Sequence, residues 1–326
     1  MAVTLSRTPL ATLPTPFVRA RGLERALGAG PVFLKRDDLT GFGIAGNKAR
    51  SLEFLLGAAA AENADILVAA GSQSSNFCAA AAMAARVAGL ECDVLFAGPP
   101  PASDCVSASV ALARTAGARL RFLAQTPREA LDEAVRSHAD TLRACGRRPY
   151  AVPRGGATAI GAAGYAMAAK EIAEQSTAAA VDPQIVVVAT GSGGTQAGLV
   201  AGQVGYDLAW RVVAAAVSRP ADATRAQVLS LSRACADQLG FPAPEPADVE
   251  VQDLRGAGFG IPSPEDRESA DIALSSEGLL LDHHYGSKAM TLLRRLVRAG
   301  VPGPVVFLHT GGIADALAGL TEGAAL

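Results

Sequence analysis

The sequence of 326 residues is poor in aromatic side chains, in lysine and in net charge. Phe, Trp and Tyr make up 5% of the chain, and the formal charge at pH 7 is -2. Such a chain lacks both the basic surface and the stacking platforms that nucleic acid binding requires. Half of the residues are hydrophobic, so the core must be built mainly from Ala, Val, Leu and Ile. No nucleic acid partner is expected.

Cysteine pairs, long apolar runs and a leader segment are also missing. The five cysteines include no CxxC pair or similar metal-binding spacing, which is typical of reduced thiols in a cytoplasmic protein. The longest apolar runs, such as residues 78–85, are well short of the ~20 residues that cross a bilayer. Residues 1–13 have no basic start followed by an apolar segment. We therefore expect a cytoplasmic protein with no metal and no membrane partner.

Short apolar runs alternate with longer Ala-rich helical stretches along almost the whole chain. This alternation predicts an α/β protein with mostly parallel sheets flanked by helices. The expected strands are Val32–Lys35, Asp65–Ala69, Asp93–Phe96, Arg119–Leu123, Ile185–Ala189, Arg211–Ala215 and Val305–His309. The expected helices are Lys48–Ala60, Asn76–Ala88, Asp104–Thr115, Pro127–Arg143, Ile160–Gln175, Gln196–Val204, Arg225–Leu239 and Lys288–Arg298.

The length of the chain favours two domains. The alternation is interrupted by residues rich in Pro and Gly at 98–101, 153–158 and 241–246. We predict a larger domain made of residues 1–49 and 155–326, and a smaller domain made of residues 50–154, each with its own sheet.

A glycine-rich segment joins one expected strand to the following helix. It consists of Gly191, Ser192, Gly193, Gly194 and Thr195. A helix start presents unpaired N–H groups and partial positive charge, and glycines let the backbone approach a bound anion. The segment matches neither GxxxxGK[ST] nor GxGxxG, which argues against a P-loop or a nicotinamide site. It is either a phosphate-binding loop or an ordinary tight turn.

Lys48 lies in a glycine-flanked loop, Gly41-Phe-Gly-Ile-Ala-Gly-Asn-Lys48, directly before an apolar helix. The positive charge of a helix start and desolvation would both favour the neutral amine, which is the form that attacks a carbonyl. The alternative is a solvated surface lysine. The chain has only three other lysines, Lys35, Lys170 and Lys288.

A third polar cluster, Gly71-Ser-Gln-Ser-Ser-Asn76, follows another expected strand and precedes an apolar helix. Ser75 or Asn76 could simply cap that helix. Alternatively, the hydroxyls and backbone donors could bind a carboxylate.

These motifs occur in an order that resembles one family. The sequence contains Lys-Arg-Asp-Asp-Leu-Thr, Gly-Asn-Lys, Ser-Asn, Gly-Ser-Gly-Gly-Thr, Leu-Asp-x-x-Tyr and His-Thr-Gly-Gly between Lys35 and Gly312. It is similar to the D-cysteine desulfhydrase and 1-aminocyclopropane-1-carboxylate deaminase family, which belongs to the tryptophan-synthase-β-like, fold-type II enzymes. The resemblance implies pyridoxal 5'-phosphate as cofactor, held by the larger domain, and a homodimer.

The resemblance also implies roles for individual residues. Lys48 would bind the cofactor aldehyde and later carry a proton. Asn76 would contact the cofactor and, with Ser75, the substrate carboxylate. Gly191 to Thr195 would hold the phosphate. Tyr285 would lie over the cofactor and assist proton transfer, and Thr310 would face the pyridine nitrogen.

The sequence departs from the family pattern mainly around the substrate. Phe77 replaces a polar residue and would make the substrate pocket more apolar. Ser51 replaces a basic residue near the phosphate, so Arg50 or the glycine loop would have to compensate. Gly286 stands where the cyclopropane deaminases carry an acid, and His283 and His284 replace Pro-Val.

We therefore expect a lyase or deaminase that removes a β-substituent from a small amino acid and releases a keto acid and ammonia. The uncharged Thr310 would make the cofactor a weaker electron sink, which suits elimination of a good leaving group. The departures favour a substrate other than D-cysteine. The alternatives are β-replacement or another carbon-chain-forming reaction, cyclopropane ring opening, and a catalytically weak cofactor-binding protein.

Overall fold

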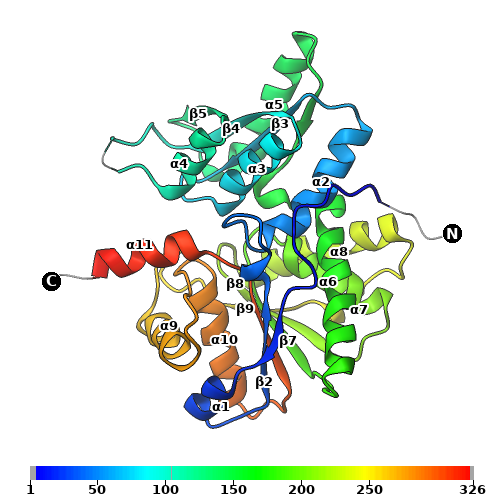
Figure 1. Ribbon diagram of the computed structural model, residues 1–326, viewed down its shortest axis with the longest axis vertical. Helices are drawn as coiled ribbons and strands as arrows, with labels where there is room; N and C mark the ends of the chain where they lie inside the picture. The colour runs from blue at the N-terminus through cyan, green and yellow to red at the C-terminus, as the bar shows by residue number, and fades with distance from the viewer. Residues whose placement is uncertain (1–4, 104, 324–326) are drawn as a thin grey trace.

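The strands form two separate sheets in the computed structural model, which describes residues 5–103 and 105–323. The six-stranded sheet has the order β1-β2-β10-β7-β8-β9, and the four-stranded sheet has the order β5-β4-β3-β6. The four-stranded sheet lies above the six-stranded sheet in the view of Figure 1. All strand pairs are parallel except β1 with β2. The expected α/β class with mostly parallel sheets is confirmed.

The six-stranded sheet is covered by helices on both faces. Its strands are β1 (Phe17–Arg19), β2 (Val32–Arg36), β7 (Ile185–Thr190), β8 (Arg211–Ala216), β9 (Glu250–Asp253) and β10 (Val305–His309). In β7, Val186 and Val188 pack with α6 (Ala159–Ala178), α7 (Gly194–Gly205) and α8 (Ala221–Leu239). Ile185 and Val187 pack on the opposite face with α1 (Arg21–Leu27), α9 (Pro264–Glu277) and α10 (Gly286–Arg298). Burial on both faces is the reason for the unbroken apolar run of this strand.

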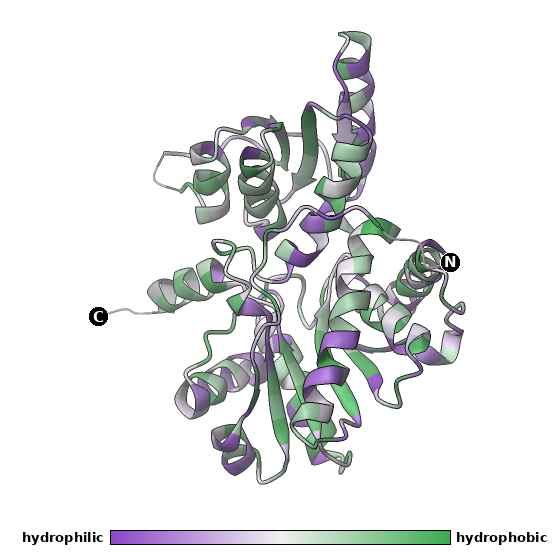
Figure 2. Ribbon diagram, turned by 45° about the vertical axis from the view of Figure 1, so that its right-hand side comes forward, coloured by the Kyte–Doolittle hydropathy of each residue, from purple (hydrophilic) through white to green (hydrophobic). Residues whose placement is uncertain are grey.

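The four-stranded sheet contains β3 (Ile66–Gly71), β4 (Glu91–Ala97), β5 (Arg119–Leu123) and β6 (Pro149–Ala151). Leu67 and Ala69 pack with α3 (Asn76–Val87) and α4 (Ala108–Thr115), whereas Val68 packs with α5 (Leu131–Ala144) on the other face. The strands of both sheets are mostly apolar, and the outer helices carry many of the polar residues (Figure 2).

Helix α2 (Lys48–Ala61) contributes to the packing around both sheets. Leu52 and Leu55 belong to the core beneath the four-stranded sheet, and Phe54 packs with α6 and α8. The buried Arg50 donates to Asp37, which follows β2, at 2.8 and 2.9 Å, and to Glu171 on α6 at 2.8 and 2.9 Å. These bonds fix the first turn of α2, and therefore Lys48, relative to the larger sheet.

Most expected elements lie within a few residues of their predicted bounds. The helix expected at Asp104–Thr115 begins at Ala108, and Asp104 lies outside the described residues. The helix expected from Pro127 begins as a 3-10 turn, η2 (Arg128–Ala130), before α5. The elements not predicted from the sequence are β1, β6, β9, α1, α9 and α11 (Ile313–Gly323). Within the described part of the chain, no helix combines the length and apolar character needed to cross a bilayer.

Candidate active site

A pocket lies where strands of both sheets end. Its walls come from the segments after β3, β7 and β10, from the start of α2 and from residues before α10. It is lined by all the residues that the sequence assigned to the site, namely Lys48, Ser75, Asn76, Phe77, Gly191, Ser192, Gly193, Gly194, Thr195, Tyr285 and Thr310. The carboxyl edge of parallel strands is the usual location of ligand sites in open α/β sheets.

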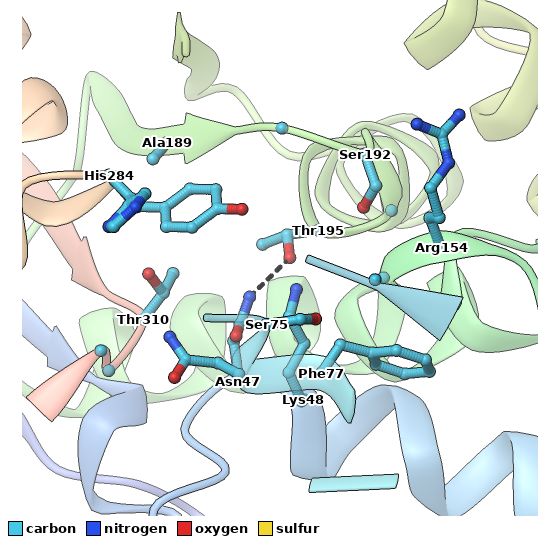
Figure 3. A pocket seen from close by; sticks show the side chains of 18 of the residues that line it. Asn47, Lys48, Ser75, Phe77, Arg154, Ala189, Ser192, Thr195, His284 and Thr310 are labelled. Carbon is cyan, nitrogen blue, oxygen red and sulfur yellow. Dashed lines mark hydrogen bonds between the residues drawn. The ribbon is translucent and has the colours of Figure 1, made fainter. Parts of the chain in front are cut away.

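Lys48 extends into this pocket from the first residue of α2 (Figure 3). The side chain is half-buried, and desolvation lowers the pKa of its amine to about 8. Within the described part of the chain, no acceptor is hydrogen-bonded to its Nζ. The structure therefore contradicts the alternative of a solvated surface lysine.

Asn47 connects Lys48 to two other walls of the pocket. Its backbone N–H donates to the carbonyl of Thr310 at 2.9 Å, and its side-chain amide donates to Oγ1 of Thr195 at 2.9 Å. A Cβ on the neighbouring Gly46 would lie 2.3 Å from the same Thr310 oxygen, so only glycine permits this approach. Lys48 is thus held between the segments that follow β7 and β10.

The start of α3 contributes Ser75 and Asn76. Ser75 is the N-cap residue, because its Oγ accepts the N–H of Cys78 at 3.3 Å. The Oδ1 atom of Asn76 is buried and has no hydrogen-bond partner. Because Asn76 lines the pocket, this oxygen is available to accept a hydrogen bond from a bound group. The capping role of Ser75 and a binding role for this segment are therefore compatible.

The glycine-rich loop opens α7 without any side-chain cap. Gly193 is the N-cap residue with φ of 100°, in a region that favours glycine. A Cβ on Gly191 would lie 2.9 Å from Cε1 of Tyr285. The uncapped start of α7 thus borders the pocket beside Ser192 and Thr195, an arrangement suited to phosphate.

Asp282 orients the segment that carries Tyr285. Its carboxylate accepts the N–H groups of His284, Tyr285 and Gly286 at 2.9, 2.7 and 3.0 Å. The Tyr285 ring packs edge-on against Phe259, with centroids 5.6 Å apart. Tyr285 is therefore fixed over one wall of the pocket.

Some of the residues that depart from the family pattern line the pocket, and others do not. Phe77 lines the pocket but is 2% exposed, and a Cβ on Gly156 would lie 2.7 Å from its ring. His284 lines the pocket, whereas His283 does not. Ser51 and Arg50 are also absent from the lining. Since Arg50 is bonded to Asp37 and Glu171, the expectation that it could compensate for Ser51 is wrong.

Several pocket residues were not predicted from the sequence. They include Asn47, Arg154, Phe259, Asp282, Gly311 and Gly312. Four of these residues, Asn47, Asp282, Gly311 and Gly312, lie within the motifs given above, so their neighbours could have indicated them. Phe259 lies in Gly256-Ala-Gly-Phe-Gly260, a glycine-rich segment whose composition could have indicated a loop near a ligand. Nothing in the local sequence distinguishes Arg154.

Comparison with protein families places this chain among known enzymes. The family described as "Pyridoxal-phosphate dependent enzyme" matches residues 9–311. The chain belongs to this family and is a pyridoxal-phosphate-dependent enzyme with the tryptophan-synthase-β-like fold.

Individual relatives agree with this assignment. The D-cysteine desulfhydrases of Salmonella choleraesuis and Salmonella paratyphi C are each 36% identical to the chain over 316 residues, which is 94% of both proteins. The crystal structure of an ACC deaminase homologue has a TM-score of 0.88 and 33% identity, and the alignment covers 95% of this chain and 93% of that one. A fungal L-serine ammonia-lyase from Rhizomucor miehei shares the fold, with 20% identity, a TM-score of 0.68 and coverage of 97% of this chain and 98% of that one.

The residues that line the pocket fit pyridoxal phosphate, independently of the similarity to known enzymes. Lys48 offers an amine whose lowered pKa suits reaction with an aldehyde. The uncapped start of α7 offers phosphate donors, and the orphaned Oδ1 of Asn76 offers a partner for a polar ring substituent or a substrate group. These three features come from separate elements and converge on one pocket.

Proposed function

We propose that this enzyme removes a β-substituent from a small amino acid and releases a keto acid and ammonia. The names of the similar D-cysteine desulfhydrases and of the ACC deaminase homologue support elimination with deamination. The observation that carries the proposal is the position of Lys48, whose amine lies in one pocket with the starts of α3 and α7.

Lys48 is the proposed cofactor-binding and catalytic residue. Bound pyridoxal phosphate supplies an electron sink that acidifies the proton on the substrate's Cα. Lys48 would hold the cofactor aldehyde through Nζ, and the same nitrogen would accept the Cα proton of the bound amino acid. The pKa of about 8 matches this function, because the neutral amine is accessible near physiological pH.

Ser75 and Asn76 are the proposed substrate-carboxylate residues. The start of α3 adds N–H groups and partial positive charge, both of which favour an anion. Asn76 also contacts the cofactor in this proposal. Phe77 contributes an apolar surface beside them, so its contribution to substrate choice is through shape.

Tyr285 and Thr310 complete the proposed set. Tyr285 orients the bound groups and assists proton transfer through its hydroxyl, while Asp282 fixes its backbone. Thr310 would be the residue beside the pyridine nitrogen, where its hydroxyl carries no charge, and Gly286 adds no acid. The resulting weaker electron sink favours elimination of a good leaving group over cyclopropane ring opening.

The substrate that we propose is a small amino acid other than D-cysteine. Phe77 and His284 are the departures that lie in the pocket, so the changes affect the substrate side of the site. A thiol or sulfite is a suitable leaving group. We further propose that the enzyme is a cytoplasmic homodimer, with neither nucleic acid nor membrane as a partner. Light scattering of the purified protein measures its mass and therefore tests the oligomeric state.

A substrate screen with purified holoenzyme tests the reaction. D- and L-amino acids with β-thiol, β-sulfinate, β-chloro and β-hydroxyl groups are incubated with enzyme, and keto acid and ammonia are measured separately. Equal amounts of both products from at least one substrate are expected, and Lys48→Ala should abolish their release. A carbon product that retains its nitrogen would instead establish β-replacement. A cofactor absorbance that responds to no amino acid would identify a catalytically weak binding protein.

A further inference from the structure

The proposed phosphate loop lacks a cation from the segment that follows Lys48. Ser51 is 6% exposed within α2 and does not line the pocket. Arg50 is bonded to Asp37 and Glu171 and is also absent from the lining. Neither residue therefore places positive charge beside a phosphate bound to the glycine loop.

Two arginines flank the glycine-rich loop instead. Arg154, in the 3-10 turn η3 (Arg154–Gly156), lines the same pocket as the loop and lies beside Ser192 in Figure 3. Arg219, in the loop after β8, donates from Nη1 to the carbonyl of Gly191 at 3.1 Å. Both arginines, together with Gly191 and Ser192, line a second cavity next to the pocket. Among the described residues, Lys48 and Arg154 are the lysine and arginine side chains that line the pocket itself.

Both guanidinium groups are held in place. Asp132 accepts the backbone N–H, Nε and Nη2 of Arg154 at 2.9, 3.1 and 3.0 Å, and the side chain is 18% exposed. A Cβ on Gly155 would lie 2.6 Å from Oγ of Ser192, so η3 packs directly on the loop. Oγ of Ser218 joins Arg219 in bonding the Gly191 carbonyl, also at 3.1 Å. Arg154 thus borders the pocket beside the loop, whereas Arg219 contacts the loop from the adjoining second cavity.

The charges near the loop explain why two arginines are useful. A phosphate monoester carries a charge of about −1.5 to −2 at pH 7. A helix start offers only about half a positive charge, and Lys48 binds the aldehyde rather than the phosphate. Asp132 offsets part of the charge of Arg154, and the exposed Glu129 lies on the same cavity. A single arginine would therefore leave the phosphate poorly balanced.

We propose that Arg154 and Arg219 together provide the positive charge that holds the cofactor phosphate in the loop Gly191–Thr195. The proposal names two cofactor-binding residues that take over the role of the basic residue replaced by Ser51. It rests on the proposed assignment of this loop to the phosphate.

Cofactor binding to the apoprotein separates phosphate binding from general damage. The affinities for pyridoxal phosphate and for pyridoxal, which lacks the phosphate, are measured by equilibrium dialysis for wild type, Arg154→Gln, Arg219→Gln and the double variant. We expect each single variant to bind pyridoxal phosphate about 5- to 10-fold more weakly and the double variant at least about 30-fold more weakly, from Coulomb interactions at a partly solvated site. The affinity for pyridoxal should change less than about twofold, because it carries no phosphate charge.

Matched variants complete the experiment. Arg154→Lys and Arg219→Lys keep the charge and should recover most of the affinity. Arg211→Gln is the control, because Arg211 is exposed at the other end of β8 and is paired with Glu250. Raising the salt concentration should weaken pyridoxal phosphate binding more in wild type than in the double variant.

Three results would overturn the inference. One is an equal loss of affinity for both ligands, which would indicate a structural role. Another is unchanged binding of pyridoxal phosphate together with an altered KM for acidic amino acids, which would assign Arg154 to the substrate. The third is a loss of phosphate preference in Thr195→Val but not in the arginine variants. If wild type itself showed no preference for the phosphorylated ligand, the loop assignment would fail before the arginines were considered.

Discussion

At the scale of single residues, the environment of Lys48 determines when its amine can react. Desolvation lowers the pKa of the amine to about 8, whereas an ordinary lysine has a pKa near 10.4. About a tenth of the amines are therefore neutral at pH 7, compared with fewer than about one in a thousand for an ordinary lysine.

This shift predicts how cofactor attachment depends on pH. In apoprotein mixed with pyridoxal phosphate, the rate of covalent attachment should rise about tenfold from pH 6 to pH 7 and level off above pH 8. Stopped-flow absorbance measures the rate, and Lys48→Arg is the control that should show no attachment. A rate that keeps rising steeply to pH 10 would show that the amine is solvated.

At the scale of elements, the first turn of α2 depends on the buried ion pairs of Arg50. Its guanidinium is 1% exposed, and the Asp37 carboxylate, which also accepts the hydroxyl of Tyr165 at 2.6 Å, is fully buried. Arg50→Leu should lower the free energy of unfolding by about 3–5 kcal/mol, because it leaves a buried carboxylate unpaired. Urea denaturation measures the change. Arg225→Leu is the control at a partly exposed ion pair with Asp222, and a loss below about 0.5 kcal/mol is expected for it.

Helix α11 carries a carboxyl group whose ionisation opposes folding. Burial and the nearby charge of Asp282 raise the pKa of Asp315 to about 7. In the unfolded chain the pKa of this carboxyl is lower, near 3.9. The contribution of its protonated form to folding stability is therefore complete below about pH 3.9 and is lost as the pH rises through 7. His284 lies 3.7 Å away and opposes the shift only when protonated.

Asp315→Asn tests this linkage. Relative to wild type, the variant should gain up to about 4 kcal/mol of stability between pH 4 and pH 8, since it has no charge to bury. Thermal unfolding at a series of pH values measures the difference between the two proteins. A difference that does not change with pH would mean that the carboxylate is well solvated in the folded state.

The elements that could be predicted from the sequence are those with strong periodicity or two-sided burial. The strand Val305–His309 has the bounds that the sequence predicted, because all five of its residues are buried. The strand β6 was missed because it has three residues and begins with Pro149. The short strand β9 was missed because Glu250, Gln252 and Asp253 are not buried. Packing, not local pattern, determines these short edge elements.

At the scale of the whole molecule, both sheets contribute to the site. Ser75 follows β3 of the four-stranded sheet, whereas the glycine loop and Thr310 follow β7 and β10 of the six-stranded sheet. The motifs identified these residues. The sequence alone could not show that Arg154 and Phe259 line the same pocket, because η3 and the segment after β9 are far apart in sequence. We propose that residues 50–154 form the smaller domain, consistent with the position of the second sheet.

Cofactor binding should therefore stabilise the whole chain. At a free concentration about 1,000 times its dissociation constant, pyridoxal phosphate should add about 4 kcal/mol to the free energy of unfolding. Calorimetry of apoprotein and holoprotein measures the shift, and Lys48→Ala should show a smaller one. A transition in which the cofactor shifts only one of two separate peaks would show that the two sheets unfold independently.

The position of α2 has a consequence for any motion between the two sheets. The helix begins at Lys48, and its later turns pack into the core of the smaller sheet while Arg50 anchors it to the larger one. A rotation of the smaller sheet would thus pivot near the reactive amine and displace it little, while Ser75 and Asn76, which follow β3, would move with that sheet. Such a rotation would open the substrate side of the pocket while Lys48 stays beside the glycine loop.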